Sequence, residues 1–89
     1  MNRIEQMRQQ LAVLEPTLID IEDDSHLHAG HAGAREGGGH YRLHIVSGKF
    51  AGLGTVARQR MVYSALGEMM KREIHAITIR ANTPEELQP

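Results

Sequence analysis

Histidines are the residues of this sequence best suited to chemistry, because the 89-residue chain contains six of them and no cysteine. Three lie in a glycine-rich stretch, residues 24–39, as His26, His28 and His31. The spacing His-x-His-x-x-His could present imidazole nitrogens to zinc, copper, nickel or iron. The alternative is a set of solvated side chains, because a flexible loop loses conformational entropy when it is ordered around a metal. The spacing by itself leaves both interpretations open.

The other three histidines lie on predicted strands. His40 and His44 belong to one strand, and His75 begins another. His75 alternates with Ile77 and Ile79, which are predicted to face the core. The pattern by itself therefore favours a half-buried His75 that is hydrogen-bonded to the backbone.

Missing residue types and motifs exclude several kinds of chemistry. A chain without cysteine has no disulfide, no cysteine-based zinc site, no thiol nucleophile and no iron–sulfur cluster held by itself alone. The sequence also lacks a recognisable Ser/His/Asp set, a paired-carboxylate site and a nucleophile elbow. We therefore expect a protein that is not an enzyme.

Charge is balanced overall but unevenly distributed. The net charge of −1 argues against a general nucleic-acid coat protein, yet residues 42–72 carry six basic residues and one acidic residue. Within that basic half, Lys49, Arg58 and Arg60 are the candidates for contact with nucleic acid. Arg58 also extends the buried stripe of a predicted helix, so its charge should either pair with a carboxylate of this chain or face an anion of a partner. The acidic residues within 20–24 are a candidate for the carboxylate.

Length and hydropathy bound the class of protein. The chain is long enough for one domain, residues 1–89, with one modest core. No stretch approaches the apolar length of a membrane span, and the first turns mix Arg with Glu, unlike a signal peptide. We expect a cytoplasmic protein without membrane association.

Hydrophobic periodicity divides the chain into helices and strands. Apolar residues at helical spacing predict helices over residues 2–14, which Pro16 ends, and 55–72. Alternation of apolar and polar residues predicts strands over residues 17–23, 40–47 and 74–80. The sequence Thr83-Pro84-Glu85-Glu86 predicts the start of a short C-terminal helical turn.

The order α-β-β-α-β predicts the topology. A long loop between the first two strands favours an antiparallel pair. The helix between the second and third strands should make a right-handed crossover, so that those two strands are parallel. The expected fold class is α+β: a two-layer domain in which both helices cover one face of a three-stranded mixed sheet.

Several segments resemble the BolA family over nearly the whole length of the chain. They are Asp24-Ser25-His26-Leu27-His28, Gly39-His40-Tyr41-Arg42, Ile45-Val46-Ser47, Phe50-x-Gly52, Arg58-x-Arg60-Met61-Val62-Tyr63, Ile74-His75-Ala76 and Thr83-Pro84-Glu85. The resemblance implies a fold similar to class II KH domains and a partnership with monothiol glutaredoxins that carry a Cys-Gly-Phe-Ser motif.

In complexes of that family, a [2Fe-2S] cluster is shared between the two proteins. The resemblance implies that the glutaredoxin cysteine and glutathione supply thiolates, while this chain supplies imidazole. His75 matches the family's C-terminal histidine ligand, and His28 matches its loop ligand. His26 and His31 are additional here, so they are alternatives for the loop ligand. Gln59 and Leu87 depart from the histidine and tryptophan that many members have.

Ligand chemistry supports the adaptor role independently of the resemblance. A chain without cysteine can replace a thiolate with a neutral imidazole, which raises the reduction potential of the cluster, as in Rieske centres. The isolated chain is expected to bind no cluster and to be a monomer or a weak homodimer.

Two other hypotheses remain open at this stage. One is a DNA-binding transcriptional regulator of stress response and cell shape, which some family members are described as being. The other is mononuclear metal binding by the loop histidines alone.

Overall fold

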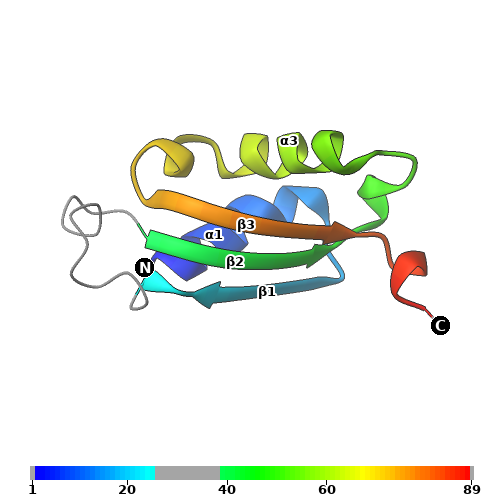
Figure 1. The fold of residues 1–89 in the computed structure, drawn as a ribbon, viewed down its shortest axis with the longest axis horizontal. Coiled ribbons are helices and arrows are strands. Elements are labelled where there is room, and N and C mark those ends of the chain that lie inside the picture. Colours follow the sequence, from blue (N-terminus) through cyan, green and yellow to red (C-terminus); the bar gives the residue numbers. More distant parts are fainter. Residues whose placement is uncertain (1, 26–38, 89) are drawn as a thin grey trace.

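The computed structural model describes residues 2–25 and 39–88. Two α-helices, α1 (Arg3–Leu11) and α3 (Thr55–Leu66), accompany three strands, β1 (Leu18–Asp23), β2 (Gly39–Val46) and β3 (Ile74–Asn82) (Figure 1). Short 3-10 helices lie between or after them: η1 (Ala12–Leu14), η3 (Gly48–Phe50), η4 (Gly67–Lys71) and η5 (Glu85–Leu87). The predicted order of helices and strands is confirmed.

The first helical segment, predicted over residues 2–14, consists of α1, which ends at Leu11, and of η1, which continues to Leu14. The side chain of Asn2 accepts a hydrogen bond of 2.8 Å from the backbone N–H of Glu5, which satisfies one of the free donors at the start of α1. After η1, Glu15 adopts a left-handed conformation with φ of 50°, and Pro16 follows. This combination stops the helix before β1 begins.

The second helix is shorter than the predicted 55–72. It ends at Leu66 because Gly67 takes a positive φ of 56°, a conformation that glycine adopts at little cost. The chain continues as η4, in which Met69 remains buried. Apolar spacing alone does not distinguish this bent continuation from one straight helix.

The three strands form one mixed sheet in the order β1-β2-β3. β1 pairs with β2 in antiparallel register, and β3 pairs with β2 in parallel register, as predicted. The parallel pair requires a crossover, which α3 and η4 supply.

Both helices cover the same face of the sheet and enclose the core. From α1 and α3, Met7, Leu11, Val62 and Leu66 are fully buried, and the inward side chains of β2 meet them, namely Tyr41, Leu43 and Ile45. Within residues 2–25 and 39–88, no helix covers the opposite face of the sheet (Figure 1). The α+β two-layer architecture is therefore confirmed, and it leaves one sheet face for polar side chains.

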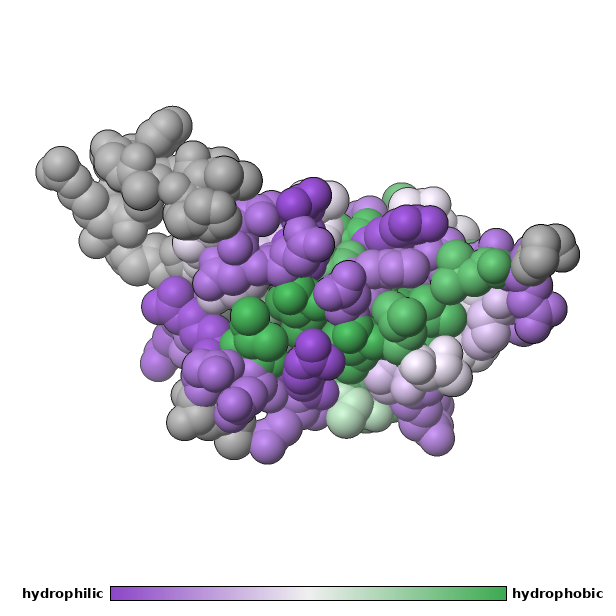
Figure 2. Space-filling view, turned by 90° about the horizontal axis from the view of Figure 1, so that it is seen from below, coloured by the Kyte–Doolittle hydropathy of each residue, from purple (hydrophilic) through white to green (hydrophobic). Residues whose placement is uncertain are grey.

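The β1 side of the molecule combines an apolar band with rows of hydrophilic side chains (Figure 2). Among its elements, Val13 of η1 and Leu18 of β1 are exposed. The outward residues Asp20 and Glu22 place negative charge on this edge strand, which discourages pairing with another strand. Within residues 2–25 and 39–88, none of the helices has the length and apolar character needed to cross a bilayer.

Candidate functional site

His75 lies at an irregularity in the parallel strand pair. Gly39 pairs with Ile74, but the next residue of β2, His40, pairs with Ala76, so His75 is one extra residue in β3. Such bulges are rare in parallel pairs, and they redirect side chains next to functional sites. Ile74 is buried and His75 is exposed. The half-buried position that strict alternation predicts is therefore wrong, because the extra residue breaks the alternation before Ile77.

The exposed ring of His75 lies beside the ring of His40. Their centroids are 5.0 Å apart and their planes are inclined by 45°. His40 is half-buried and alternates with the core residue Tyr41, so it belongs to the uncovered face of the sheet. Sequence reasoning did not assign His40 to the site. The signal that could have found it is the strand register, which no sequence pattern displays.

The separation of the two rings suits binding to one metal. Two imidazoles on neighbouring positions of one tetrahedral metal, each bonded at about 2.1 Å, have ring centres about 5 Å apart. In the described part of the chain, no group of three or more His, Cys, Asp or Glu side chains could hold a metal ion. The pair could therefore occupy half of a tetrahedral coordination shell and leave the other half to ligands from elsewhere.

Gly39 allows the strand end that carries the pair to pack closely. A Cβ atom at this position would lie 2.5 Å from Cε2 and Cζ of the Tyr41 ring, which is only 3% exposed. Only glycine leaves room for that ring on the adjacent backbone.

Backbone hydrogen bonds hold the same strand end. The N–H of His40 donates to the hydroxyl of Ser25 at 3.0 Å, and its C=O accepts from the N–H of Asp24 at 2.7 Å. The N–H of Gly39 donates to the C=O of Glu73 at 2.8 Å. His40 is therefore fixed to the chain before residues 26–38, and its neighbour Gly39 is fixed to the segment that leads into β3.

The rest of the uncovered sheet face is an ordered set of polar pairs. The guanidinium of Arg42 lies 2.6 Å from the carboxylate of Asp24 and 2.7 Å from that of Glu22. The hydrogen bond to Asp24, together with the negative charges of Asp24 and Glu22, raises the pKa of Arg42. His44 Nε2 is 2.9 Å from Oδ1 of Asn82. His44 thus has a side-chain partner within the sheet.

The predicted loop ligand lies outside the described residues. His28 and its alternatives His26 and His31 all fall within residues 26–38. The structure thus places one of the sequence-predicted ligands, His75, and adds His40 beside it.

Arg58 is held in a structural clamp. Its side chain is only 13% exposed and forms two hydrogen bonds with the Glu86 carboxylate, at 2.7 and 2.8 Å. It also donates to the C=O of Leu53 at 2.8 Å and to that of Ala81 at 3.0 Å. The prediction of a carboxylate partner is confirmed, but the suggested acidic run, residues 20–24, is wrong. Those carboxylates lie on or next to β1, whereas Arg58 joins α3 to the end of β3.

The clamp also shapes the C-terminal turn. Glu86 accepts a hydrogen bond of 2.9 Å from the N–H of Thr83, and the Thr83 hydroxyl accepts from the N–H of Glu86. This reciprocal cap is the one predicted from the Thr83-Pro84-Glu85-Glu86 sequence. The hydrogen bond from Arg58, aided by that from Thr83, lowers the pKa of Glu86 to about 2.

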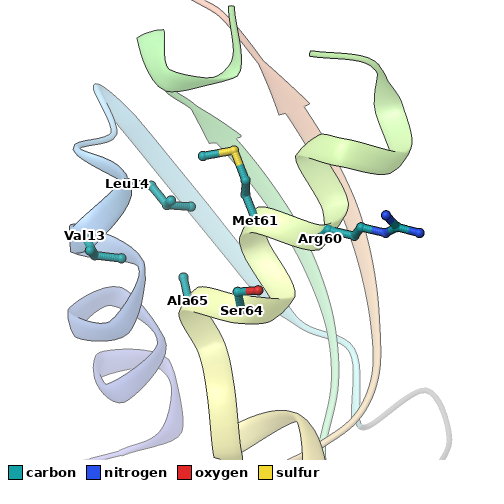
Figure 3. A pocket seen from close by; sticks show the side chains of 6 residues that line it. All are labelled: Val13, Leu14, Arg60, Met61, Ser64 and Ala65. Carbon is teal, nitrogen blue, oxygen red and sulfur yellow. The ribbon is translucent and has the colours of Figure 1, made fainter.

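The other two predicted nucleic-acid contacts have different surroundings. Lys49 Nζ lies 3.2 Å from Oε1 of Glu15, and the two side chains are 47% and 77% exposed. Arg60 lines the rim of an apolar groove of about 400 Å³ between η1 and α3, where Val13 and Leu14 face Met61 and Ala65 (Figure 3). The Arg60 side chain points away from Val13 and Leu14. Among the described residues, the lining of this groove includes no imidazole and no carboxylate.

These features define a small α+β domain that presents imidazoles at one end of its sheet. The family model of "BolA-like protein" matches residues 11–86. The chain therefore belongs to the BolA-like family.

Individual relatives agree with this assignment. The chain is 42% identical over 89 residues to "Protein BOLA1, chloroplastic" of Arabidopsis thaliana, covering 96% of this chain and 56% of that protein. It is 31% identical over 75 residues to "DNA-binding transcriptional regulator BolA" of Escherichia coli K12, covering 84% of this chain and 69% of that protein. The solved structure of BolA1 from Arabidopsis thaliana superposes with a TM-score of 0.83 at 41% identity, covering 100% of this chain and 98% of that one.

The chain spans about half of the length of the chloroplast relative. The compartment in that relative's name belongs to that protein, and the cytoplasmic location of this chain stays a prediction.

Proposed function

We propose that this chain is a non-enzymatic adaptor that pairs with a monothiol glutaredoxin and supplies histidine ligation to a shared [2Fe-2S] cluster. The observation that supports it most directly is the exposed His75 ring, 5.0 Å from that of His40, in a chain without cysteine. When bound, the cluster would supply electron-transfer and iron–sulfur delivery chemistry that the chain itself lacks.

The number and kind of ligands explain why a partner would be needed. Two neutral imidazoles leave the remaining coordination positions of the cluster unfilled, and thiolates are the usual ligands for them. A glutaredoxin cysteine and glutathione would provide these thiolates. Because His75 is exposed and lies at the end of the sheet, a docked protein can reach it without unfolding the domain.

Mixing experiments test this proposal. Adding the purified chain to a cluster-loaded monothiol glutaredoxin, in the presence of glutathione, should change the visible absorption and circular dichroism spectra. The His75→Ala variant should abolish that change, whereas His44→Ala should keep it, because His44 pairs with Asn82 within the sheet. A His75→Ala spectrum identical to that of the wild type would show that the ligand assignment is wrong.

DNA binding is the second candidate function, and the name of the Escherichia coli relative favours it. Lys49 and Arg60 have exposed side chains that phosphate could reach, whereas Arg58 is engaged by Glu86. If the chain binds DNA through this surface, affinity should fall steeply as salt rises, and Lys49→Ala with Arg60→Ala should reduce the slope by about one unit per lost phosphate contact. The absence of a specific complex at physiological salt would exclude this role.

A further inference from the structure

We propose that the free edge of β3, together with the adjoining flank of α3, binds an extended segment of a partner protein as a fourth strand of the sheet. The segment would carry alternating apolar side chains and a carboxylate that faces Arg80. This inference goes beyond the proposed function and does not depend on it, because it involves neither a histidine nor a cluster.

β3 has backbone groups that point away from the rest of the sheet. It is an edge strand, because within residues 2–25 and 39–88 only β2 pairs with it. The C=O of Asn82 points towards β2 and accepts a hydrogen bond of 2.9 Å from the residue after β2. The C=O of Ala81 points the opposite way and accepts one of 3.0 Å from Arg58. Because backbone direction alternates along a strand, the N–H and C=O groups of Ile77 and Ile79 also point outward, where another strand could pair with them.

The two edges of the sheet differ in how well they are protected against such pairing. On the β1 edge, Arg8 of α1 donates to the C=O of Ile19 at 3.3 Å, and two carboxylates, Asp20 and Glu22, add negative charge. β3 is nine residues long and, histidine aside, carries one charged side chain, that of Arg80. Short length, charged side chains and covering groups are the usual protections of an edge strand. The less protected edge is therefore that of β3.

A flank of α3 supplies an apolar surface beside this edge. Met61 and Tyr63 lie about 100° to either side of the buried Val62. Met61 faces η1, so Tyr63 faces away from it (Figure 3). Val56 lies two helical turns before Tyr63 on the same flank, and the two residues are 64% and 39% exposed. Since α3 packs against β3 and runs along it on the side away from β1 (Figure 1), this flank adjoins the free edge.

The spacing of the two layers fits one added strand better than a second copy of this chain. Two packed helices, each about 10 Å across, are wider than three strands spaced about 4.8 Å apart. A fourth strand beside β3 would therefore lie over the outer flank of α3. If the β3 strands of two copies paired in one continuous sheet, their α3 helices would come closer than the about 8–10 Å that packed helices need.

Charge defines the partner segment further. Arg80 is exposed, and in the described part of the chain no carboxylate forms an ion pair with it. A carboxylate at the facing position of an added strand would pair with its guanidinium. Because side chains alternate along a strand, the neighbouring residues of the segment would lie over Val56 and Tyr63, where apolar side chains fit. The partner is thus an extended segment with both acidic and apolar residues, held mainly by backbone hydrogen bonds.

Amide hydrogen exchange in the free chain tests the edge itself. The N–H groups of Ile77 and Ile79 should exchange at least about tenfold faster than those of Thr78 and Arg80, which point towards β2. Equal protection of all four groups would show that the edge is already closed, and the proposal would fail.

A display library of nine-residue peptides with alternating apolar positions supplies the binding probe. The selected peptides should contain an acidic residue and should shift the NMR signals of Ile77, Ile79 and Tyr63 in the full chain. A library that yields no binder, or binders that shift signals elsewhere, would refute the proposal. A concentration-dependent dimer that protects Ile77 and Ile79 without peptide would assign the edge to a second copy instead, and would also refute it.

Matched variants identify the contacts. Val56→Lys should weaken binding of the selected peptides by about fivefold or more, because buried anchors carry most of the affinity of an interface. Val13→Lys is the control, since Val13 of η1 is 66% exposed, and it should have no effect. Arg80→Glu should weaken binding of the acidic peptides by about three- to fivefold, whereas Arg3→Glu on α1 should not. Losses of the same size in the control variants would show that the peptides bind another surface.

Discussion

Replacing Gly39 with alanine should destabilise the domain by forcing a methyl group against a buried ring. The added Cβ would lie 2.5 Å from two ring atoms of Tyr41, and Tyr41 is only 3% exposed on the core face of the sheet, so its ring has little room to move. Overpacking of this kind typically costs about 1–3 kcal/mol, and alanine recovers about 0.4–1 kcal/mol by restricting the unfolded chain. We therefore expect a net loss of about 1–2 kcal/mol in the free energy of unfolding, which lowers Tm by about 4–16 °C in a domain of this size.

Urea and thermal denaturation measure this loss, and two comparisons identify its cause. Gly48→Ala is the matched control, because its Cβ would meet no atom within 4 Å, so its stability should be unchanged or slightly higher. In a Tyr41→Leu background, Gly39→Ala should cost much less than in the wild type, because the ring is gone. An equal cost in both backgrounds, or a wild-type Tm for Gly39→Ala, would refute the argument from close packing.

Two further predictions concern hydrogen bonds. Ser47→Ala should lower the free energy of unfolding, measured by urea denaturation, by about 1–3 kcal/mol. The fully buried Ser47 hydroxyl donates a hydrogen bond of 2.6 Å to the C=O of Leu14 in η1 and accepts one of 3.0 Å from the N–H of Lys49. As a control, Ser64→Ala, at an exposed position, should change this free energy by less than about 0.5 kcal/mol. The pKa of Glu86 is lowered from 4.5 to about 2, mainly by the hydrogen bond from Arg58. The ionised carboxylate therefore stabilises the fold at any pH above the pKa of Glu86 in the unfolded chain. This stabilisation is lost as the pH falls to the pKa of Glu86 in the folded protein. Glu86→Gln should therefore flatten the loss of stability between about pH 5 and pH 2, whereas Glu85→Gln should retain the wild-type slope, and identical slopes for all three proteins would contradict this account.

The two groups of functional candidates occupy different parts of the fold. The histidine pair lies where β2 begins beside the start of β3, while the Arg58 clamp joins α3 to the turn after the end of β3. Replacing Arg58 would thus lower the stability of the domain through lost hydrogen bonds. A loss of DNA binding in such a variant could not be assigned to a lost phosphate contact. Tests of DNA binding are better made with Lys49 and Arg60, whose side chains are exposed.

The sequence by itself determined the order of the elements, the inward faces of β1 and β2 and the topology of the sheet. These follow from the alternation of Tyr41 with Ile45, from the helical spacing of Val62 with Leu66, and from the handedness of crossovers, all of which are local or general rules. The reciprocal cap of the C-terminal turn was equally predictable, since its residues are adjacent.

Only the tertiary structure decided which residues meet. The register shift beside Gly39 turns His75 outward next to His40, and the choice of Glu86 as partner for Arg58 depends on where the chain returns after β3. Both are contacts between residues more than twenty positions apart, and a one-residue change of register reverses the face of a strand residue. Patterns within single segments carry no information on such contacts, because they record which side of an element is apolar and not which element lies opposite.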